Sequence, residues 1–370
     1  MTRPGQRAMA RLLPDDAPGR AVALEVLRGG GIVAMPTDTV YGVGVALDAP
    51  DGLARLFAAK NRPLDRAIVL LVAHMEQAAS VGVISPVARL LAERFWPGGL
   101  TLVLAQAPGA VLPAALTGGA GTIGVRVPDH DCPRELARAL GPLPVTSANL
   151  SGQPEARDAA GVLEQLGERI ELVLDGGLAR GGTPSTVVDC SGELPRVLRE
   201  GAIEAGRLVE ALETAFMGDR GSRDVAKSRA VRAVGIEAAV AAAKRLAERV
   251  AVGGDYESPD FWAFLLGAEF GRGDPELGWD FLCRVTEAVS DERALSLIGA
   301  SQLKDFCWVA GPAFIDRIEE RARTHPRFRA ALSEVWPGRG TIPAEIYARI
   351  RRASGRGETQ PDDARPGLDI

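Results

Sequence analysis

The segment AIVLLVA, from Ala67 to Ala73, is an uninterrupted apolar run. Such a run is typical of a strand buried on both faces, as in a sheet that helices cover on either side. The segment from Ile32 to Met35 is a second apolar run, and Pro36 ends it in a polar Thr-Asp-Thr. A buried strand that ends in a polar turn is where α/β proteins place ligands, although an ordinary strand and turn would look the same.

Strand-like and helical patterns alternate without long gaps over residues 15–217. This alternation predicts an α/β domain with a largely buried, mixed sheet. We expect a mobile lead-in over residues 1–17 and a closing helix from Ile203 to Phe216. Besides the two apolar runs, the expected strands cover 43–47, 100–104, 122–127, 144–146, 171–174, 185–189 and 196–198.

The second part of the chain has a different pattern. Residues 218–230 are polar and contain glycine, which indicates a linker. Over residues 231–350 strand patterns are missing, helical spacing recurs and four of the five tryptophans occur. We therefore predict an all-α domain over 231–350 with an aromatic core. Residues 351–370 are rich in Gly, Asp, Arg and Pro and should form a disordered tail.

Charge and composition exclude several classes of function. The net charge of -5 gives no global basic field for nucleic acid or an anionic membrane. A local basic cluster from Arg317 to Arg329 is expected to be a solvated helix face paired with Glu319 and Glu320. The four cysteines show no CxxC spacing and indicate reduced, mostly buried thiols. The three histidines are not paired at ligand spacing, so no protein-bound metal is predicted.

The chain shows no signal peptide and no apolar stretch long enough to span a bilayer. We therefore expect a cytoplasmic protein without a membrane partner.

Three cationic side chains lie at positions where each could bind an anion. Lys60 and Arg62 lie at a predicted helix end beside Pro63. They could form a polyphosphate-binding site, or they could be solvated surface charges. Arg126 lies inside an apolar strand and must find an anion or an acceptor, because burying it unpaired is costly. A structural salt bridge to a carboxylate such as Asp129 and a substrate carboxylate satisfy that need equally well.

Two hydroxyl-rich segments follow or begin strands. Thr146 to Gly152 offers hydroxyls and an amide, either as an N-cap cluster or as a polar wall for a nucleotide or an amino acid. Thr183 to Asp189 places two hydroxyls at a strand start, and Arg199 follows the next short strand. Each segment has a structural interpretation that suffices when it is taken alone.

Taken together and in this order, the segments resemble the threonylcarbamoyl-AMP synthase family of YrdC-like proteins. No single motif is specific, but the ordered set is. The resemblance covers about residues 15–215. Its motifs stand at Pro36 to Gly42, Lys60 to Pro63, Trp96 to Thr101, Val125 to His130, Ser147 to Gly152, Ser185 to Asp189 and Leu198 to Gly201.

The resemblance implies a twisted mixed sheet with flanking helices and a central cavity. It also implies an L-threonylcarbamoyladenylate synthase, a nucleotidyltransferase that forms threonylcarbamoyl-AMP and pyrophosphate from L-threonine, bicarbonate and ATP. Mg²⁺ would accompany the ATP. The product would serve the N6-threonylcarbamoyladenosine modification of tRNA position 37 through a downstream tRNA threonylcarbamoyl transferase complex, and a contact with double-stranded RNA or tRNA belongs to this expectation.

Site residues follow from the same resemblance. Lys60 and Arg62 would be catalytic, with Arg62 facing the phosphates or the carbamate. L-Threonine would be held by Thr37, Arg126, Ser147 and Ser185. ATP would be held by Lys60, Thr122, Asn149 and Arg199.

The sequence departs from the family pattern at three places. The apolar run 67–73 lacks a histidine that family members often carry, which leaves one threonine contact open. Glu155-Ala156-Arg157 replaces a Ser-Pro-Thr, with Arg157 a candidate substitute for the nucleotide contact. Glu200 stands where proline is usual.

Two alternatives remain at this point. The same fold would also suit a non-catalytic RNA- or nucleotide-binding regulatory protein. The Trp-rich helical domain does not look like the second α/β domain of longer family members. It is expected to dock a partner or to have a role that the sequence does not reveal.

Overall fold

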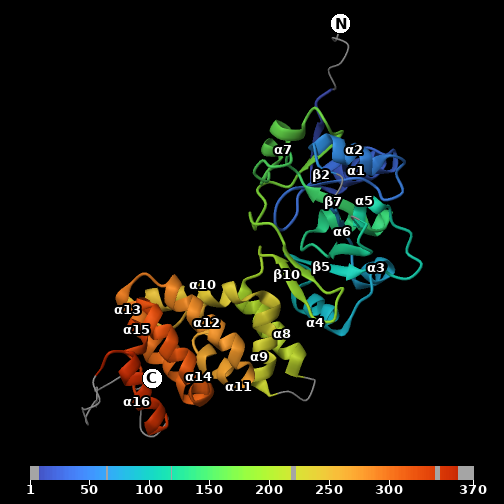
Figure 1. Cartoon of the computed structure of the whole chain (residues 1–370). Helices are drawn as coiled ribbons and strands as arrows, with labels where there is room; N and C mark the ends of the chain where they lie inside the picture. Colours follow the sequence, from blue (N-terminus) through green and yellow to red (C-terminus); the bar gives the residue numbers. More distant parts are fainter. Residues whose placement is uncertain (1–7, 64–65, 118, 218–221, 338–341, 357–370) are drawn as a thin grey trace. The chain divides into compact units, whose positions relative to one another are not determined.

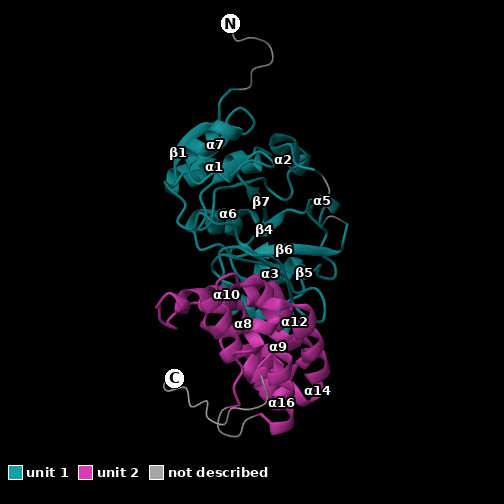
Figure 2. Ribbon diagram, turned by 60° about the vertical axis from the view of Figure 1, so that its left-hand side comes forward, with its two compact units in different colours: residues 1–204 teal, residues 205–370 magenta. Residues whose placement is uncertain are grey.

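A computed structural model of the chain describes residues 8–63, 66–117, 119–217, 222–337 and 342–356 (Figure 1). It divides into two units, residues 1–204 and residues 205–370 (Figure 2). The division falls within the first residues of the helix that was predicted to close the α/β domain. We describe each unit by itself.

The first unit is built on a ten-stranded mixed sheet with the order β1-β8-β2-β3-β7-β4-β6-β5-β9-β10. Strands far apart in sequence are neighbours, as where β4 lies between β7 and β6. The strands are β1 (Arg11–Pro14), β2 (Val33–Met35), β3 (Gly42–Gly44), β4 (Val69–Leu71), β5 (Leu100–Ala105), β6 (Thr122–Arg126), β7 (Leu143–Ser147), β8 (Leu172–Asp175), β9 (Thr186–Asp189) and β10 (Arg196–Arg199).

Helices of the first unit cover the central strands. Leu27 of α1 and Leu136 of α6 pack with Met35, Leu71 and Leu174 in one buried cluster. The α/β prediction is therefore confirmed, and the strand predicted within 67–73 is β4. The helices are α1 (Ala17–Arg28), α2 (Gly52–Lys60), α3 (Met75–Val81), α4 (Pro86–Phe95), α5 (Ala114–Thr117), α6 (Asp131–Leu140) and α7 (Ala159–Leu166).

The predicted mobile lead-in is wrong for the residues described. Arg11–Pro14 forms β1 and pairs in parallel with β8, with Leu13 opposite Leu174. Its pairing partner lies more than 150 residues away, so no local pattern could indicate it. Residues 1–7 of the lead-in lie outside the described residues.

Among its described residues the second unit contains helices joined by turns and loops and no strand, which confirms the all-α prediction. The fully buried rings include Phe270, Phe281, Phe306 and Phe328, whereas Trp308 and Trp336 are exposed, so phenylalanine forms the aromatic core. The elements are α8 (Ala205–Met217), α9 (Arg223–Val234), α10 (Ile236–Ala251), the 3₁₀ turn η1 (Phe261–Ala263), α11 (Leu266–Gly273), α12 (Pro275–Ala288), α13 (Glu292–Ile298), the π-helical η2 (Gly299–Leu303), α14 (Lys304–Thr324), α15 (Pro326–Leu332) and α16 (Ala344–Ala353).

Three boundaries in this unit differ from the sequence prediction. The closing helix α8 belongs to the second unit, where its Glu213 accepts hydrogen bonds from Arg223 and Lys227 of α9. Of the predicted linker 218–230, residues from Arg223 onward are helical, and 218–221 lie outside the described residues. Of the predicted tail 351–370, residues up to Ala353 end α16, and 357–370 lie outside the described residues.

The basic cluster of this unit is largely engaged in ion pairs, as expected. Arg323 contacts the predicted partner Glu320 at 3.6 Å, whereas other members have partners outside the cluster. Arg317 contacts Glu276 at 2.8 Å and Arg321 contacts Glu287 at 3.2 Å. Glu319 pairs with Arg349 of α16 at 2.6 Å. Among the described residues, no helix combines the length and the apolar character needed to cross a membrane.

Candidate functional site

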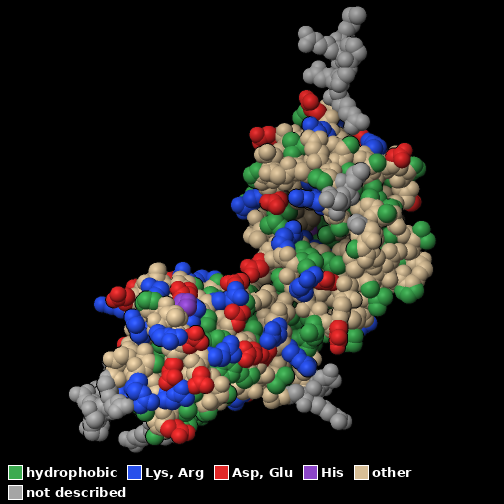
Figure 3. Space-filling model, in the orientation of Figure 1, with side chains coloured by type: hydrophobic (Ala, Val, Ile, Leu, Met, Phe, Trp, Pro, Cys, Tyr) green, Lys and Arg blue, Asp and Glu red, His purple; other side chains and the backbone are tan. Residues whose placement is uncertain are grey.

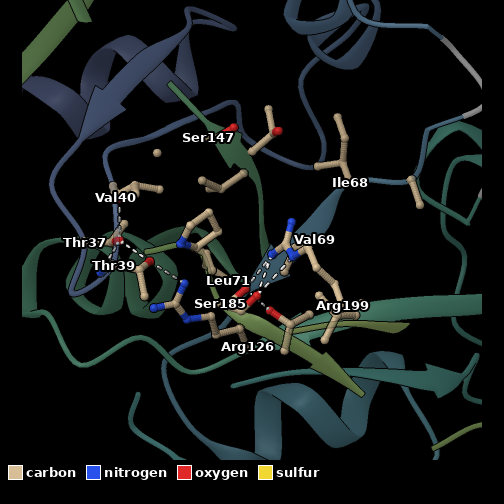
Figure 4. A pocket seen from close by; sticks show the side chains of 18 of the residues that line it. Thr37, Thr39, Val40, Ile68, Val69, Leu71, Arg126, Ser147, Ser185 and Arg199 are labelled. Carbon is tan, nitrogen blue, oxygen red and sulfur yellow. Dashed lines mark hydrogen bonds between the residues drawn. The ribbon is translucent and has the colours of Figure 1, made fainter. Parts of the chain in front are cut away.

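A cavity of about 370 Å³ opens on the sheet of the first unit. In the space-filling view, Lys and Arg side chains gather around a hollow in this unit (Figure 3). The close-up shows hydroxyl and guanidinium groups directed into the cavity beside an apolar wall (Figure 4). Its walls come from the β2–β3 turn, from strands β4, β5, β6, β7, β9 and β10, and from Arg62 and Glu155.

One end of the cavity is built by the β2–β3 turn and Arg126 of β6. The guanidinium of Arg126 donates to Asp38 Oδ1 at 2.5 Å, to Thr39 Oγ1 at 2.9 Å and to the carbonyl of Gly98 at 2.9 Å. Thr37 Oγ1 donates to the carbonyl of Val40 at 2.6 Å and so shapes the turn. The buried cation is thus paired through Asp38, and not through Asp129, while its remaining N–H groups can still serve a ligand.

A second group lies at the start of β9. Arg199 donates to the Ser185 carbonyl at 2.7 Å and to Ser185 Oγ at 3.2 Å. Thr101 Oγ1 lies 2.9 Å from Ser185 Oγ. Burial lowers the pKa of Arg199 from its ordinary value. A desolvated guanidinium that is held by neutral acceptors is suited to pair with an anion.

Lys60 lies behind the cavity wall. It is 1% exposed, and its ammonium donates to the carbonyls of Ser147 and Asn149, the latter at 2.6 Å, and to Asn149 Oδ1 at 3.2 Å. Ser147 Oγ in turn lies 2.6 Å from Asn149 Oδ1. Burial and the nearby Arg62 lower the pKa of Lys60 to about 7. Lys60 therefore fixes the segment that carries Ser147.

The structure brings most of the predicted site residues to one cavity and leaves two outside its lining. Lys60 and Asn149 do not line the cavity and reach it through Ser147. Asp38, Thr39 and Thr101 were not predicted as site residues, although all three lie in the motifs that the chain shares with the family. The predicted residues that line the cavity are Thr37, Arg62, Thr122, Arg126, Ser147, Ser185 and Arg199.

The departures from the family pattern also have places in the structure. Leu71 stands where family members often carry a histidine, and it lines the cavity together with Val69. Arg157 is exposed beside Gly182 and is not among the lining residues. Of the three replacing residues, only Glu155 lines the cavity.

Comparisons with known proteins agree with this geometry. The Sua5/YciO/YrdC family model, described as "Telomere recombination", matches residues 25–201. A protein of Mycobacterium leprae named putative threonylcarbamoyl-AMP synthase is 40% identical over 201 residues, which cover 54% of this chain and 90% of that protein. The threonylcarbamoyl-AMP synthase of Bacillus subtilis is 37% identical over 214 residues, 57% of this chain and 61% of its own.

A solved structure gives the same result. The crystal structure of Pyrococcus abyssi Sua5 complexed with L-threonine superposes with a TM-score of 0.53 at 34% identity, covering 55% of this chain and 61% of that chain. This chain thus spans about six tenths of the B. subtilis and P. abyssi proteins. Residues 254–357 match a separate family of unknown function, DUF6869.

Proposed function

The chain belongs to the Sua5/YciO/YrdC family, and we propose that its first unit is an L-threonylcarbamoyladenylate synthase. As a nucleotidyltransferase it would form threonylcarbamoyl-AMP and pyrophosphate from L-threonine, bicarbonate and ATP. The product would supply the threonylcarbamoyl group for N6-threonylcarbamoyladenosine in tRNA, through a separate transferase. Relatives that carry the synthase name support this assignment.

The observation that carries the proposal is the division of the cavity between two guanidinium groups. Arg126 lies beside the hydroxyls of Thr37 and Thr39, and Arg199 lies beside Ser185 and Val69 (Figure 4). A threonine carboxylate suits the first group, because a guanidinium binds a carboxylate in bidentate fashion. The ATP phosphates suit the second group, together with Arg62.

The proposed reaction needs little general acid–base catalysis from the protein. The neutral threonine amine attacks the carbon of bicarbonate and water leaves, which gives a carbamate. A carbamate oxygen then attacks the α-phosphorus of ATP, and the bond to the β-phosphate oxygen breaks to release pyrophosphate. Holding the reactants in line and neutralising the charge on the leaving group would supply most of the rate. Lys60 would contribute indirectly, by holding Ser147 in position through its hydrogen bond to the Ser147 carbonyl.

Magnesium would enter with ATP. Glu155 is the carboxylate among the lining residues, and Asp38, which Arg126 engages, is not one of them. In the part of the chain that the structure describes, no group of three or more His, Cys, Asp or Glu side chains could hold a metal ion. We propose that the ATP phosphates hold the ion and that Glu155 supplies a protein oxygen. Bound in this way, magnesium would neutralise triphosphate charge.

The test is pyrophosphate release by the full chain with ATP, bicarbonate and magnesium, with and without L-threonine. Threonine-dependent release is expected, and it should fall sharply in Lys60→Ala and Arg126→Ala. The exposed Lys244→Ala provides a control in the second unit. ATP binding without threonine-dependent release would refute the synthase and point to a non-catalytic nucleotide-binding protein. Normal turnover in Lys60→Ala would remove Lys60 from the site.

A further inference from the structure

The second unit contains a cavity of its own, of about 230 Å³. Small-molecule sites span roughly 300–1,000 Å³, so this volume suits a compact ligand. One face of α10, with Leu246 and Val250, forms an aliphatic wall. Tyr256, Phe264 and Trp336 supply aromatic rings. The body of the cavity is therefore apolar.

The π-helical segment Gly299–Leu303 forms another wall, and it is clamped in place. Gln302 is 2% exposed, donates to the carbonyl of Ala263 at 2.6 Å and accepts from the Gly267 N–H at 2.9 Å. At its other end, Gly299 approaches the backbone so closely that a Cβ there would lie 2.1 Å from the Ala331 carbonyl oxygen. A π-helical turn is rare and is often found at functional sites. These contacts hold the π-helical wall in place, so the cavity is preformed.

The cavity has one polar corner, formed by Lys304 and Asp305. The Lys304 ammonium lies 3.5 Å from Asp305 Oδ1 and 5.1 Å from the centroid of a Trp336 ring. The two side chains are 27% and 22% exposed. Burial raises the pKa of Asp305, although Lys304 and, at longer range, Arg272 oppose the rise. Two opposite charges are therefore held as an ion pair at one corner of an apolar cavity.

The charge of this corner selects the ligand class. A purely cationic ligand would satisfy Asp305 but repel Lys304, and a purely anionic ligand would do the reverse. A ligand with both charges satisfies both side chains and leaves the cavity neutral. A compact zwitterion with an apolar body has these properties.

We propose that this cavity binds a free α-amino acid with an apolar side chain, such as leucine. Its carboxylate pairs with Lys304, its ammonium pairs with Asp305, and its side chain lies among Leu246, Val250 and Phe264. This site is separate from the cavity of the first unit and does not depend on the function proposed there.

The test is isothermal titration of the full chain with L-leucine, with 3-methylbutylamine, which lacks the carboxylate, and with 4-methylpentanoate, which lacks the amine. Leucine is expected to bind, and both analogues should bind at least about tenfold more weakly, because each loses a charge-assisted hydrogen bond. Lys304→Met and Asp305→Asn should weaken leucine binding to a similar degree. Equal binding of the amine or of the acid, or no binding of leucine, would overturn the proposal.

Three further variants separate the possible explanations of the result. Ala247→Phe fills the cavity from α10 and should abolish binding while both charges remain. Lys244→Met, on the same helix and paired at the surface with Glu248, should bind leucine like the unchanged chain. Arg126→Ala should also leave leucine binding intact. Loss of binding in that variant, where urea unfolding shows it to be folded, would place leucine in the first cavity instead.

Discussion

Asp38 Oδ1 lies 2.5 Å from Arg126 Nη2, and the two side chains are only 12% and 7% exposed. The pair joins a turn after β2 to the end of β6, strands separated in the sheet by β3, β7 and β4. A buried ion pair contributes little net stability, but removing one partner leaves an uncompensated charge. The pair therefore explains how the charge of a buried arginine is balanced and how its side chain is held at the cavity.

Arg126→Met should damage stability and activity for separate reasons. The unfolding free energy should fall by about 3–5 kcal/mol, because Asp38 is left buried and unpaired. Threonine-dependent pyrophosphate release below saturating threonine should fall by a factor on the order of 10–100, because the threonine carboxylate loses its charge-assisted hydrogen bonds. Urea unfolding and a coupled pyrophosphate assay measure the two effects.

The double variant Asp38→Asn with Arg126→Met separates these effects. With both charges removed, most of the lost stability should return, whereas the activity should not. Recovery of activity together with stability would mean that Arg126 only supports the fold.

The parts of this structure that the sequence predicts well are those with local patterns. The apolar runs at 32–35 and 67–73 are strands because their hydrophobicity alone demands burial on both faces. The gathering of Thr37, Ser185 and Arg199 at one cavity was expected from the resemblance, since seven ordered motifs identify the family and with it the topology.

Contacts between residues far apart in the chain could not be predicted from local sequence patterns. Asp129 was considered as the partner of Arg126 because it is near in sequence, whereas the strand order brings Asp38 there instead. Lys60 was expected in the site, but it is turned into the interior at the end of α2, where Asn61 has a left-handed conformation with φ of 50°. In α14 the helix continues through Pro312, because a buried apolar face extends on both sides of it.

The buried Lys60 should give the fold a specific pH dependence. Its pKa is about 7 in the folded chain and 10.5 ordinarily, so between these values the unfolded chain binds more protons. The folded state should therefore gain stability as pH rises through this window, relative to a chain without this lysine. Urea unfolding of the unchanged chain and of Lys60→Met from pH 7 to about pH 10 should show the difference moving in favour of the lysine.

Lys244→Met, at a surface position, is the matched control and should show no such trend. Parallel pH profiles for Lys60→Met and the unchanged chain would mean that Lys60 keeps an ordinary pKa.

Gly201→Ala should impair catalysis without touching a functional side chain. A Cβ at this position would lie 2.4 Å from the Pro184 carbonyl oxygen and 2.7 Å from that of Ser185, the acceptor of Arg199. The added methyl group must push this segment, and displacements of about 1 Å can cost on the order of 100-fold in rate. Gly192→Ala, whose nearest neighbour is 3.9 Å away, should be active. Equal activity of the two variants would show that the segment is not part of the site.

Gly267→Ala should destabilise the second unit and disturb the cavity beside η2. A Cβ on Gly267 would lie 2.0 Å from the carbonyl oxygen of Gln302, a backbone atom that cannot move alone. We expect the free energy of unfolding to fall by about 1–3 kcal/mol. Tryptophan fluorescence can monitor this unfolding, because four of the five tryptophans lie in this unit. Gly311→Ala, where the nearest atom is a side-chain methyl of Ile346 at 3.4 Å, should be neutral or stabilising. If both glycines tolerate alanine equally, the π-helical wall is not clamped, and the preformed ligand site loses its structural basis.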